Sequence, residues 1–201
     1  MQLYVDWDGT ITARDTLHMV IERFGDLGVF REMERRLERE LTLDEVIATE
    51  MATISAPFDE VIDWLLEHVE IRPGLAALVQ LFDPIVVSAG FDEFIVPVLA
   101  REGIAVRVVA NSVTADPAGW QATFRDSPVC DECGERCKRG VIAATGPYVY
   151  VGDGVSDRCV SLGATRIFAR DGLASWLTGC GVAYETFADM DDVRRALARR
   201  G

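Results

Sequence analysis

The sequence has little positive charge and no long apolar run. Its 201 residues include 20 lysines and arginines against 33 aspartates and glutamates, and the formal net charge is −13. A surface of this sign repels the phosphates of DNA and RNA, which argues against a nucleic-acid partner. No apolar stretch approaches the ~20 residues of a transmembrane helix, and no signal segment precedes the first predicted strand. We therefore expect a cytoplasmic protein without membrane contact.

Lysine is nearly absent from the chain. Lys138 is the single lysine, and every other basic residue of the lysine and arginine class is an arginine. A lysine kept at one place suggests a site that needs a compact ammonium group instead of a planar guanidinium. The alternative is a lysine retained by chance on a solvated loop.

The five cysteines are an odd number in a chain without a predicted secretion signal, so reduced thiols are expected. Cys159 and Cys180 have apolar neighbours in the sequence and are predicted to be small core residues. Cys130, Cys133 and Cys137 begin with a Cys-x-x-Cys pattern that suggests a structural zinc site. Zinc usually takes four ligands, so a histidine or an acidic residue would have to supply the fourth. The alternative is a reduced loop without metal.

Acidic residues follow two apolar runs that are typical of buried strands. The run at residues 3–5 ends in Asp6 and Asp8, and a later run ends in Asp153 and Asp157. The carboxyl ends of parallel strands meet at one edge of an α/β sheet, where ligands bind. Crowded carboxylates resist joint ionisation, and a hard divalent cation such as Mg²⁺ relieves this. Alternatively, Asp153 and Asp157 cap the helix that follows them.

Four segments resemble, in order, the motifs of the haloacid dehalogenase-type phosphatases. They are Asp6-Trp7-Asp8-Gly9-Thr10, Val86-Val87-Ser88-Ala89-Gly90, Lys138, and Gly152-Asp153-Gly154-Val155-Ser156-Asp157. The motifs span most of the chain. The resemblance implies an enzyme that hydrolyses a phosphate monoester of a small metabolite, with Mg²⁺ as cofactor.

The resemblance also assigns catalytic roles. Asp6 is expected to be the nucleophile that becomes phosphorylated, and Asp8 the general acid and then the base that activates water. Thr10 is expected to position Asp8 or its loop. The expected magnesium ligands are Asp6, the main-chain carbonyl of Asp8, and Asp153. Asp157 is expected to support these groups without binding the metal ion directly, partly through its contact with Lys138.

The phosphate itself is expected to bind to a different set of groups. The hydroxyl of Ser88 and the ammonium of Lys138 would each contact a phosphate oxygen. Small residues at Gly9, Ala89 and Gly90 would let main-chain N–H groups approach the phosphate.

The expected fold is a Rossmann-like parallel α/β core, residues 1–13 and 73–201, with a helical cap at residues 14–72 and a small β-hairpin. A Thr42–Glu45 capping box and a Pro57 start mark two cap helices, and Asp116–Gly119 marks the hairpin turn. Helices are expected at 16–24, 29–39, 43–51, 57–69, 75–81, 92–101, 158–162 and 191–200. Strands are expected at 3–5, 84–87, 106–115, 121–124, 148–151, 165–169 and near Val182.

The identity of the phosphate ester depends on the residue at the entry to the cap. Phosphoserine phosphatases have a glutamate at the position of Asp15 and use it to bind the substrate amine. Phosphatases that act on 2-hydroxy-3-keto-5-methylthiopentenyl-1-phosphate, in methionine salvage, are closer, since they share an aspartate there and a cysteine before the lysine. The alternatives are a phosphoserine-type enzyme, phosphotransfer to an alcohol, and a family member that binds phosphate without catalysis.

Overall fold

A mostly parallel β-sheet forms the centre of the computed structural model, which describes residues 1–37, 39–142 and 146–199. Within these residues the sheet has seven strands in the order β4-β3-β2-β1-β5-β6-β7, and only the β3–β4 hairpin is antiparallel. The strands are β1 (Gln2–Val5), β2 (Ile85–Phe91), β3 (Arg107–Thr114), β4 (Gln121–Thr123), β5 (Tyr148–Gly152), β6 (Arg166–Ala169) and β7 (Glu185–Thr186). The prediction of an α/β fold with a hairpin is confirmed.

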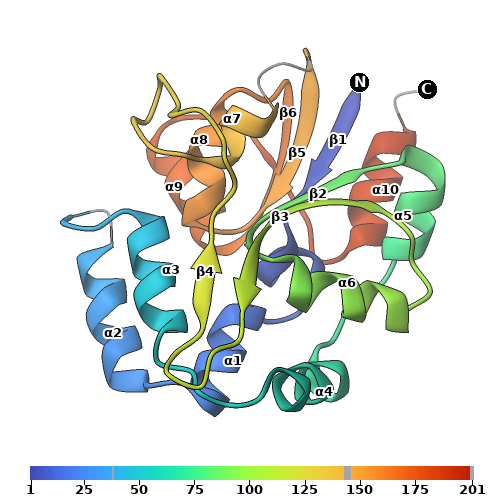
Figure 1. Ribbon diagram of the computed structural model, residues 1–201. Helices are drawn as coiled ribbons and strands as arrows, with labels where there is room; N and C mark the ends of the chain where they lie inside the picture. The colour runs from blue at the N-terminus through green and yellow to red at the C-terminus, as the bar shows by residue number, and fades with distance from the viewer. Residues whose placement is uncertain (38, 143–145, 200–201) are drawn as a thin grey trace.

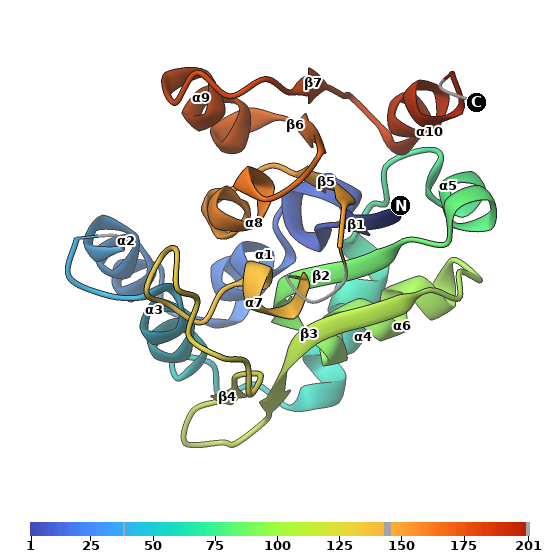
Figure 2. The same ribbon diagram turned by 90° about the horizontal axis from the view of Figure 1, so that it is seen from above.

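Helices cover both faces of the sheet (Figure 2). On one face lie α5 (Leu75–Phe82), α6 (Asp92–Arg101) and α10 (Met190–Ala198), and on the other lie α7 (Lys138–Ile142), α8 (Arg158–Leu162) and α9 (Asp171–Gly179). Alternation along β1 separates the two cores, because Leu3 and Val5 pack on the α5, α6 and α10 face while Tyr4 packs with Tyr150 and Val160 on the other. The central strands are thus buried on both faces, as parallel strands usually are.

A helical insertion leaves the core after β1 and returns before α5. It contains α1 (Thr16–Phe24), α2 (Leu27–Arg36), α3 (Leu43–Met51) and α4 (Phe58–His68), and it lies at the carboxyl ends of the strands (Figure 1). Both connections run side by side, because Ala13 donates to the carbonyl of Glu70 and Arg72 donates to that of Ile11, each over 2.9 Å. We call this pair of connections the neck of the insertion, and the predicted boundaries at residues 14 and 72 fall within it. That the insertion acts as a cap stays a prediction.

Several predicted elements differ from the observed ones. Helix α9 was not expected, because Gly172 and Gly179 lower its helix propensity; it forms because Leu173 and Leu177, one turn apart, are both buried. The last strand lies at β7, beyond Val182, which packs instead on the α9 side of the sheet. Two parts of predicted helices, residues 38 and 200, lie outside the described residues.

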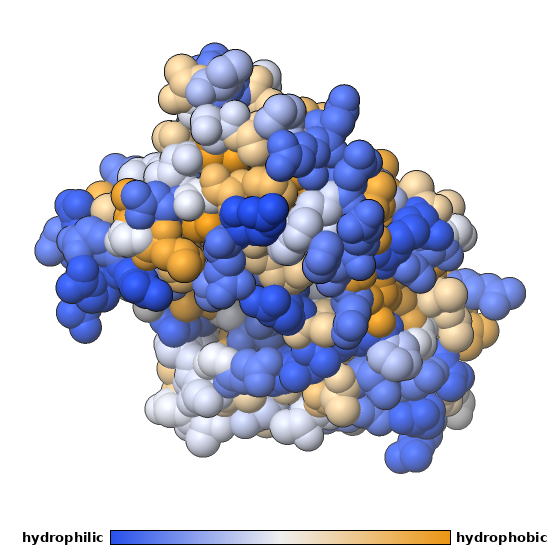
Figure 3. Space-filling model, turned by 90° about the horizontal axis from the view of Figure 1, so that it is seen from below, coloured by the Kyte–Doolittle hydropathy of each residue, from blue (hydrophilic) through white to orange (hydrophobic). Residues whose placement is uncertain are grey.

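The face on which the insertion lies is mainly hydrophilic, with smaller apolar areas between the charged side chains (Figure 3). Among the residues that the structure describes, no helix has the length and apolar character needed to cross a membrane.

Candidate functional site

Asp6 and Asp8 lie where β1 passes into a π-helical turn, η1 (Trp7–Ile11). The side chain of Asp6 is buried, and only 4% of the residue is exposed. The turn depends on Gly9, which has a φ of +69° and where a Cβ atom would lie 2.3 Å from Oδ2 of Asp153. Glycine at this position therefore lets the first acidic strand end come into contact with the second.

Lys138 is the first residue of α7 and is only 2% exposed. Its Nζ donates to Oδ1 of Asp6 over 2.5 Å and to Oδ1 of Asp157 over 2.7 Å. Burial alone would lower the pKa of Lys138, but the charges of Asp157 and Asp6 and the two hydrogen bonds raise it. The lysine is therefore charged and fixed between two carboxylates, which excludes the solvated-loop interpretation.

Asp157 accepts hydrogen bonds at both of its carboxylate oxygens. Oδ1 accepts from Lys138 and from the hydroxyl of Tyr150 (2.5 Å), and Oδ2 accepts from the main-chain N–H groups of Asp153 (2.9 Å) and Gly154 (3.0 Å). Burial would raise the pKa of Asp157, but Lys138 and these hydrogen bonds hold it below its usual value. Four donors leave little capacity for a metal ion, so Asp157 is placed to orient Lys138.

Asp6, Asp153 and Asp157 form an acidic cluster, and Asp6 and Asp153 are its candidate metal ligands. With Asp157 they can bring three carboxylate oxygens within 4.8 Å of one another. Burial, followed by the charge of Asp157, raises the pKa of Asp153 to about 6 and raises that of Asp6 as well. Two oxygen donors whose ionisation is opposed by crowding fit a site for a hard divalent cation, whose charge would offset this repulsion.

Two roles were predicted for Thr10: direct contact with Asp8 is wrong, and support of the loop stays a prediction. Its hydroxyl donates to Oδ1 of Asp153 over 2.7 Å and does not contact Asp8, because η1 turns Thr10 towards β5. Asp8 is held by Thr16 instead, whose main-chain N–H (2.8 Å) and hydroxyl both donate to Oδ1. Burial, followed by the charge of Asp15, raises the pKa of Asp8 to about 7. A carboxyl group with this pKa exchanges a proton readily near neutral pH.

Ser88 is the central residue of β2 and is fully buried. Its Oγ accepts from the main-chain N–H of Gly90 over 2.8 Å and lies 3.4 Å from Oδ2 of Asp8. The sequence motif therefore brings Ser88 to the same edge as the first aspartates. That the hydroxyl of Ser88 contacts a phosphate oxygen stays a prediction.

Four residues that support the site escaped the sequence analysis: Thr16, Tyr150, Asn111 and Arg125. Nδ2 of Asn111 donates to the carbonyl of Ala89 (2.7 Å), and Nη1 of Arg125 donates to the carbonyl of Ser88 (2.9 Å), so both hold the middle of β2 in place. Strand alternation could have placed Tyr150 on the α7 and α8 side of the sheet. No sequence signal pointed to the partners of the other three.

A pocket of about 240 Å³ opens between the acidic cluster and helices α1, α2 and α3. We call it the aspartate pocket; it is lined by Asp6, Asp8, Ala89, Gly90 and Asp153 from the core, and by Asp15, Leu17, His18, Phe30, Glu34, Leu37, Leu43, Val46, Ile47 and Glu50 from the insertion. Asp15 is exposed and accepts from the main-chain N–H of His18 (2.8 Å), which makes it the N-cap of α1. The insertion thus forms one wall of a pocket whose floor carries the motif residues.

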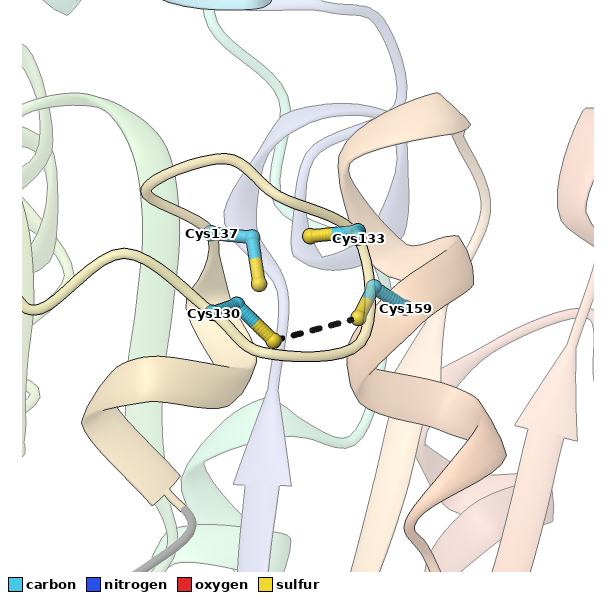
Figure 4. Close-up of side chains that lie close together, drawn as sticks. All are labelled: Cys130, Cys133, Cys137 and Cys159. Atoms are coloured by element: carbon cyan, nitrogen blue, oxygen red, sulfur yellow. Dashed lines mark hydrogen bonds between the residues drawn. The ribbon is translucent and has the colours of Figure 1, made fainter.

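The cysteines are arranged differently from the prediction. Cys130, Cys133 and Cys137 converge as expected, but their neighbour is Cys159, which had been assigned to the core (Figure 4). Cys180 is exposed, so its core assignment is also wrong. Neighbouring residues in the sequence did not predict burial here, because Cys159 in α8 is only partly buried and Cys180 follows the end of α9.

Comparisons with known proteins agree with this geometry. A 2-hydroxy-3-keto-5-methylthiopentenyl-1-phosphate phosphatase of Bacillus thuringiensis is 27% identical to the chain, over 98% of this chain and 95% of the relative. The protein of the same name from Bacillus anthracis gives the same identity and coverage. A crystal structure of phosphoserine phosphatase from T. onnurineus has a TM-score of 0.67 at 15% identity, over 96% of this chain and 91% of that one.

A further solved structure, a phospho-aspartyl intermediate analogue of phosphoserine phosphatase, has a TM-score of 0.71 at 16% identity over 97% of both chains. At this identity the likeness concerns the fold. The model of the haloacid dehalogenase-like hydrolase family matches residues 3–161, a segment that contains all four predicted motifs. The predicted hydrolase identity is thereby confirmed, and the chain belongs to the haloacid dehalogenase-like hydrolase family.

Proposed function

We propose that the protein is a Mg²⁺-dependent phosphatase that hydrolyses a small phosphate monoester through a phosphorylated Asp6. The observation that carries the proposal is the buried contact of Asp6 with Lys138 beside the acidic cluster. A cation held by Asp6, the main-chain carbonyl of Asp8 and Asp153 would neutralise phosphate charge. Lys138 supplies a second positive charge, at Oδ1 of Asp6, and Asp157 keeps that lysine in place.

The reaction takes place in two steps. An oxygen of Asp6 attacks phosphorus and the bond to the leaving alkoxide breaks, while Asp8 gives its proton to the alkoxide. Asp8 then takes a proton from water, which attacks the phosphorylated Asp6 and releases inorganic phosphate. The arrangement of Asp8 suits this role, because Thr16 occupies Oδ1 and leaves Oδ2 on the side of Ser88.

The aspartate pocket favours a substrate whose only anionic group is the phosphate. Among the described residues, its lining contains no arginine or lysine that would bind a substrate carboxylate. Apolar side chains of α1, α2 and α3, such as Phe30 and Val46, form the wall away from the phosphate end. A keto-enol phosphate with an apolar methylthio tail matches this lining, and curated relatives are named for such a substrate.

Glu50 is a buried polar residue on that wall. It is 2% exposed, lines the aspartate pocket, and its Oε1 has no hydrogen-bond partner among the described residues. Burial, followed by the charges of Glu34 and Asp15, raises its pKa to about 8. A neutral Glu50 carboxyl would donate a hydrogen bond to a keto or hydroxyl oxygen of the substrate.

Phosphoserine is the second candidate substrate. Asp15 and Glu34 line the same pocket and would bind an ammonium group. The test is a comparison of kcat/KM for 2-hydroxy-3-keto-5-methylthiopentenyl-1-phosphate and phosphoserine with Mg²⁺ present. We expect the keto-enol ester to be preferred at least ~10-fold, which corresponds to about 1.4 kcal/mol of transition-state binding.

Each outcome of this comparison has a distinct meaning. A preference for phosphoserine would leave the phosphatase in place and overturn the proposed substrate. Binding of inorganic phosphate without turnover of either ester, or of a panel of phosphorylated metabolites, would support a non-catalytic family member. Full activity in excess chelator would contradict the Mg²⁺ dependence.

The protonation of Glu50 also predicts a pH dependence of stability. The folded protein keeps a proton on Glu50 up to about pH 8, whereas the unfolded chain releases it near 4.5. The folded state therefore binds more protons between these values, and this group's contribution to the free energy of unfolding falls as pH rises from about 5 to 8. Glu50→Gln should remove that fall.

Thermal unfolding of both proteins from pH 5 to pH 8 measures the effect. Relative to pH 5, wild type should lose at least about 1 kcal/mol more than Glu50→Gln by pH 8, or about 2–4 °C in Tm. The neighbouring Glu45→Gln, at an exposed capping position of the same helix, is the matched control and should keep the wild-type slope. Parallel Tm curves for wild type and Glu50→Gln would contradict a neutral Glu50.

A further inference from the structure

Four cysteines converge at one point outside the acidic cluster. The cysteine cluster consists of Cys130, Cys133 and Cys137, from the segment between β4 and α7, and Cys159 from α8 (Figure 4). Their sulfur atoms lie within 4.8 Å of one another. Figure 4 shows all four side chains pointing into the same space, and none of them forms a disulfide.

The spacing of the sulfur atoms fits a tetrahedral metal better than a covalent bond. The Sγ atoms of Cys130 and Cys159 are 3.8 Å apart, far more than the ~2.05 Å of a disulfide. Four thiolates at ~2.3 Å from a central zinc ion would be separated by roughly 3.8 Å along each tetrahedral edge. The observed distance therefore corresponds to the ligand separation of a Cys₄ zinc site.

The local backbone supports such a site. The main-chain N–H of Gly134 donates to the carbonyl of Cys130 (2.8 Å), and that of Cys130 donates to the carbonyl of Glu135 (2.9 Å). These bonds close a tight turn that directs Cys130 and Cys133 to the same side. In residues 124–137 the structure describes only turns and loop, without a helix or strand. A metal would give this segment the fixed core that its sequence does not otherwise provide.

Arginines near the cysteine cluster would balance its charge. Four thiolates around one zinc ion carry a net charge of −2. A second pocket, separate from the aspartate pocket, is lined by Cys133, Cys137 and Cys159 together with Arg136 and Arg158. Arg139 interacts with Cys159. This matters in a protein whose overall charge is already −13. Thiolates select a borderline ion such as zinc, and they would not compete with the carboxylate site for Mg²⁺.

Two residues of the cysteine cluster, Cys137 and Cys159, are close in the sequence to the ion pair of Lys138 and Asp157. Cys137 directly precedes Lys138, and Cys159 follows Asp157 by two residues. Lys138 and Asp157 are joined over 2.7 Å. A metal that fixes Cys137 to Cys159 would thus fix the start of α7 to the start of α8, and with them the contact on which the position of Lys138 depends.

We propose that Cys130, Cys133, Cys137 and Cys159 bind one structural zinc ion. This ion maintains the contact between Lys138 and Asp157. Binding releases the thiol protons, so each ligand enters as a thiolate. The zinc ion takes no part in the reaction and lies outside the aspartate pocket. Cys180, which is exposed and outside the cluster, is not involved.

The test measures zinc directly and does not depend on phosphatase activity. The protein is purified without added metal and without a metal-binding tag, stripped of metal under reducing conditions, and titrated with zinc. We expect one equivalent to bind, and X-ray absorption of the zinc-loaded protein should show four sulfur ligands at ~2.3 Å. Cys159→Ser should weaken zinc binding at least ~10-fold, while the matched control Cys180→Ser should bind as wild type does.

Several results would overturn the proposal. They are wild-type protein that binds no zinc when reduced and folded, zinc with nitrogen or oxygen ligands in the absorption spectrum, or unchanged affinity in Cys159→Ser. A mass lower by two hydrogens in the native protein, from a Cys130–Cys159 disulfide, would replace zinc by a redox pair. If Cys159→Ser does not fold, the wild-type absorption spectrum decides alone.

Discussion

Asp6→Asn is expected to reduce phosphatase turnover at least ~10³-fold, a loss of about 4 kcal/mol of transition-state stabilisation. The amide cannot form the phosphorylated intermediate, and it removes one of the two charges that face Lys138. The fold should survive, because burial, followed by the charge of Asp157, raises the pKa of Asp6, and a neutral amide avoids both of these costs. The measurement is steady-state hydrolysis of an aryl phosphate with Mg²⁺, together with thermal unfolding.

Asp59→Asn is the matched control for this prediction. Asp59 is an exposed residue in the first turn of α4, far along the chain from the motif residues. The control should keep wild-type kinetics. If Asp6→Asn retained activity within tenfold of wild type, Asp6 would not be the nucleophile, and the proposed mechanism would have to be abandoned.

Lys138→Arg is expected to lower kcat/KM at least ~100-fold, which corresponds to about 2.7 kcal/mol. The site is closed around an ammonium group, because Nζ contacts Asp6 and Asp157 at 2.5 and 2.7 Å and the residue is only 2% exposed. A guanidinium keeps the charge but is wider and planar, so it would displace one carboxylate or the other. The measurement is kcat/KM for the same aryl phosphate, with Tm recorded for each variant.

Two further variants make this result interpretable. Arg195→Lys, at an exposed position of α10, is the reverse exchange and should leave both activity and Tm unchanged. Lys138→Met keeps the length of the side chain without the charge, and should lose at least as much activity as Lys138→Arg. Near-native kinetics in Lys138→Arg would show that the ammonium shape is not required.

The first aspartates of the two acidic motifs could be predicted because each directly follows a strand. Apolar runs marked β1 and β5, and because these strands are parallel neighbours, Asp6 and Asp153, which directly follow them, lie at the same edge of the sheet. The predicted bounds of α1, α6 and α8 agree with the structure, since polar or acidic residues mark their starts. The capping box at Thr42 is also present, with Glu45 in its expected place.

The supporting contacts could not be predicted, because they depend on how separate segments pack. Thr16 at the start of α1 donates to Asp8, and Arg125, which follows β4, donates to the main-chain carbonyl of Ser88 in β2. The contact of Thr10 with Asp153 could not be predicted for the same reason. Cys159 escaped as a partner of the other cysteines because it is distant from them in the sequence and is brought to them only when α8 packs beside α7.

The burial of the single lysine has a consequence for the chemical labelling of this protein. Reagents that modify primary amines require an accessible, unprotonated nitrogen, and Lys138 is 2% exposed with a raised pKa. In the folded state, modification should therefore be confined to the α-amino group, giving a protein with one attached dye. Acylation of Lys138 would occur only in molecules that have opened, so the rate of a second attachment would report unfolding without any engineered probe.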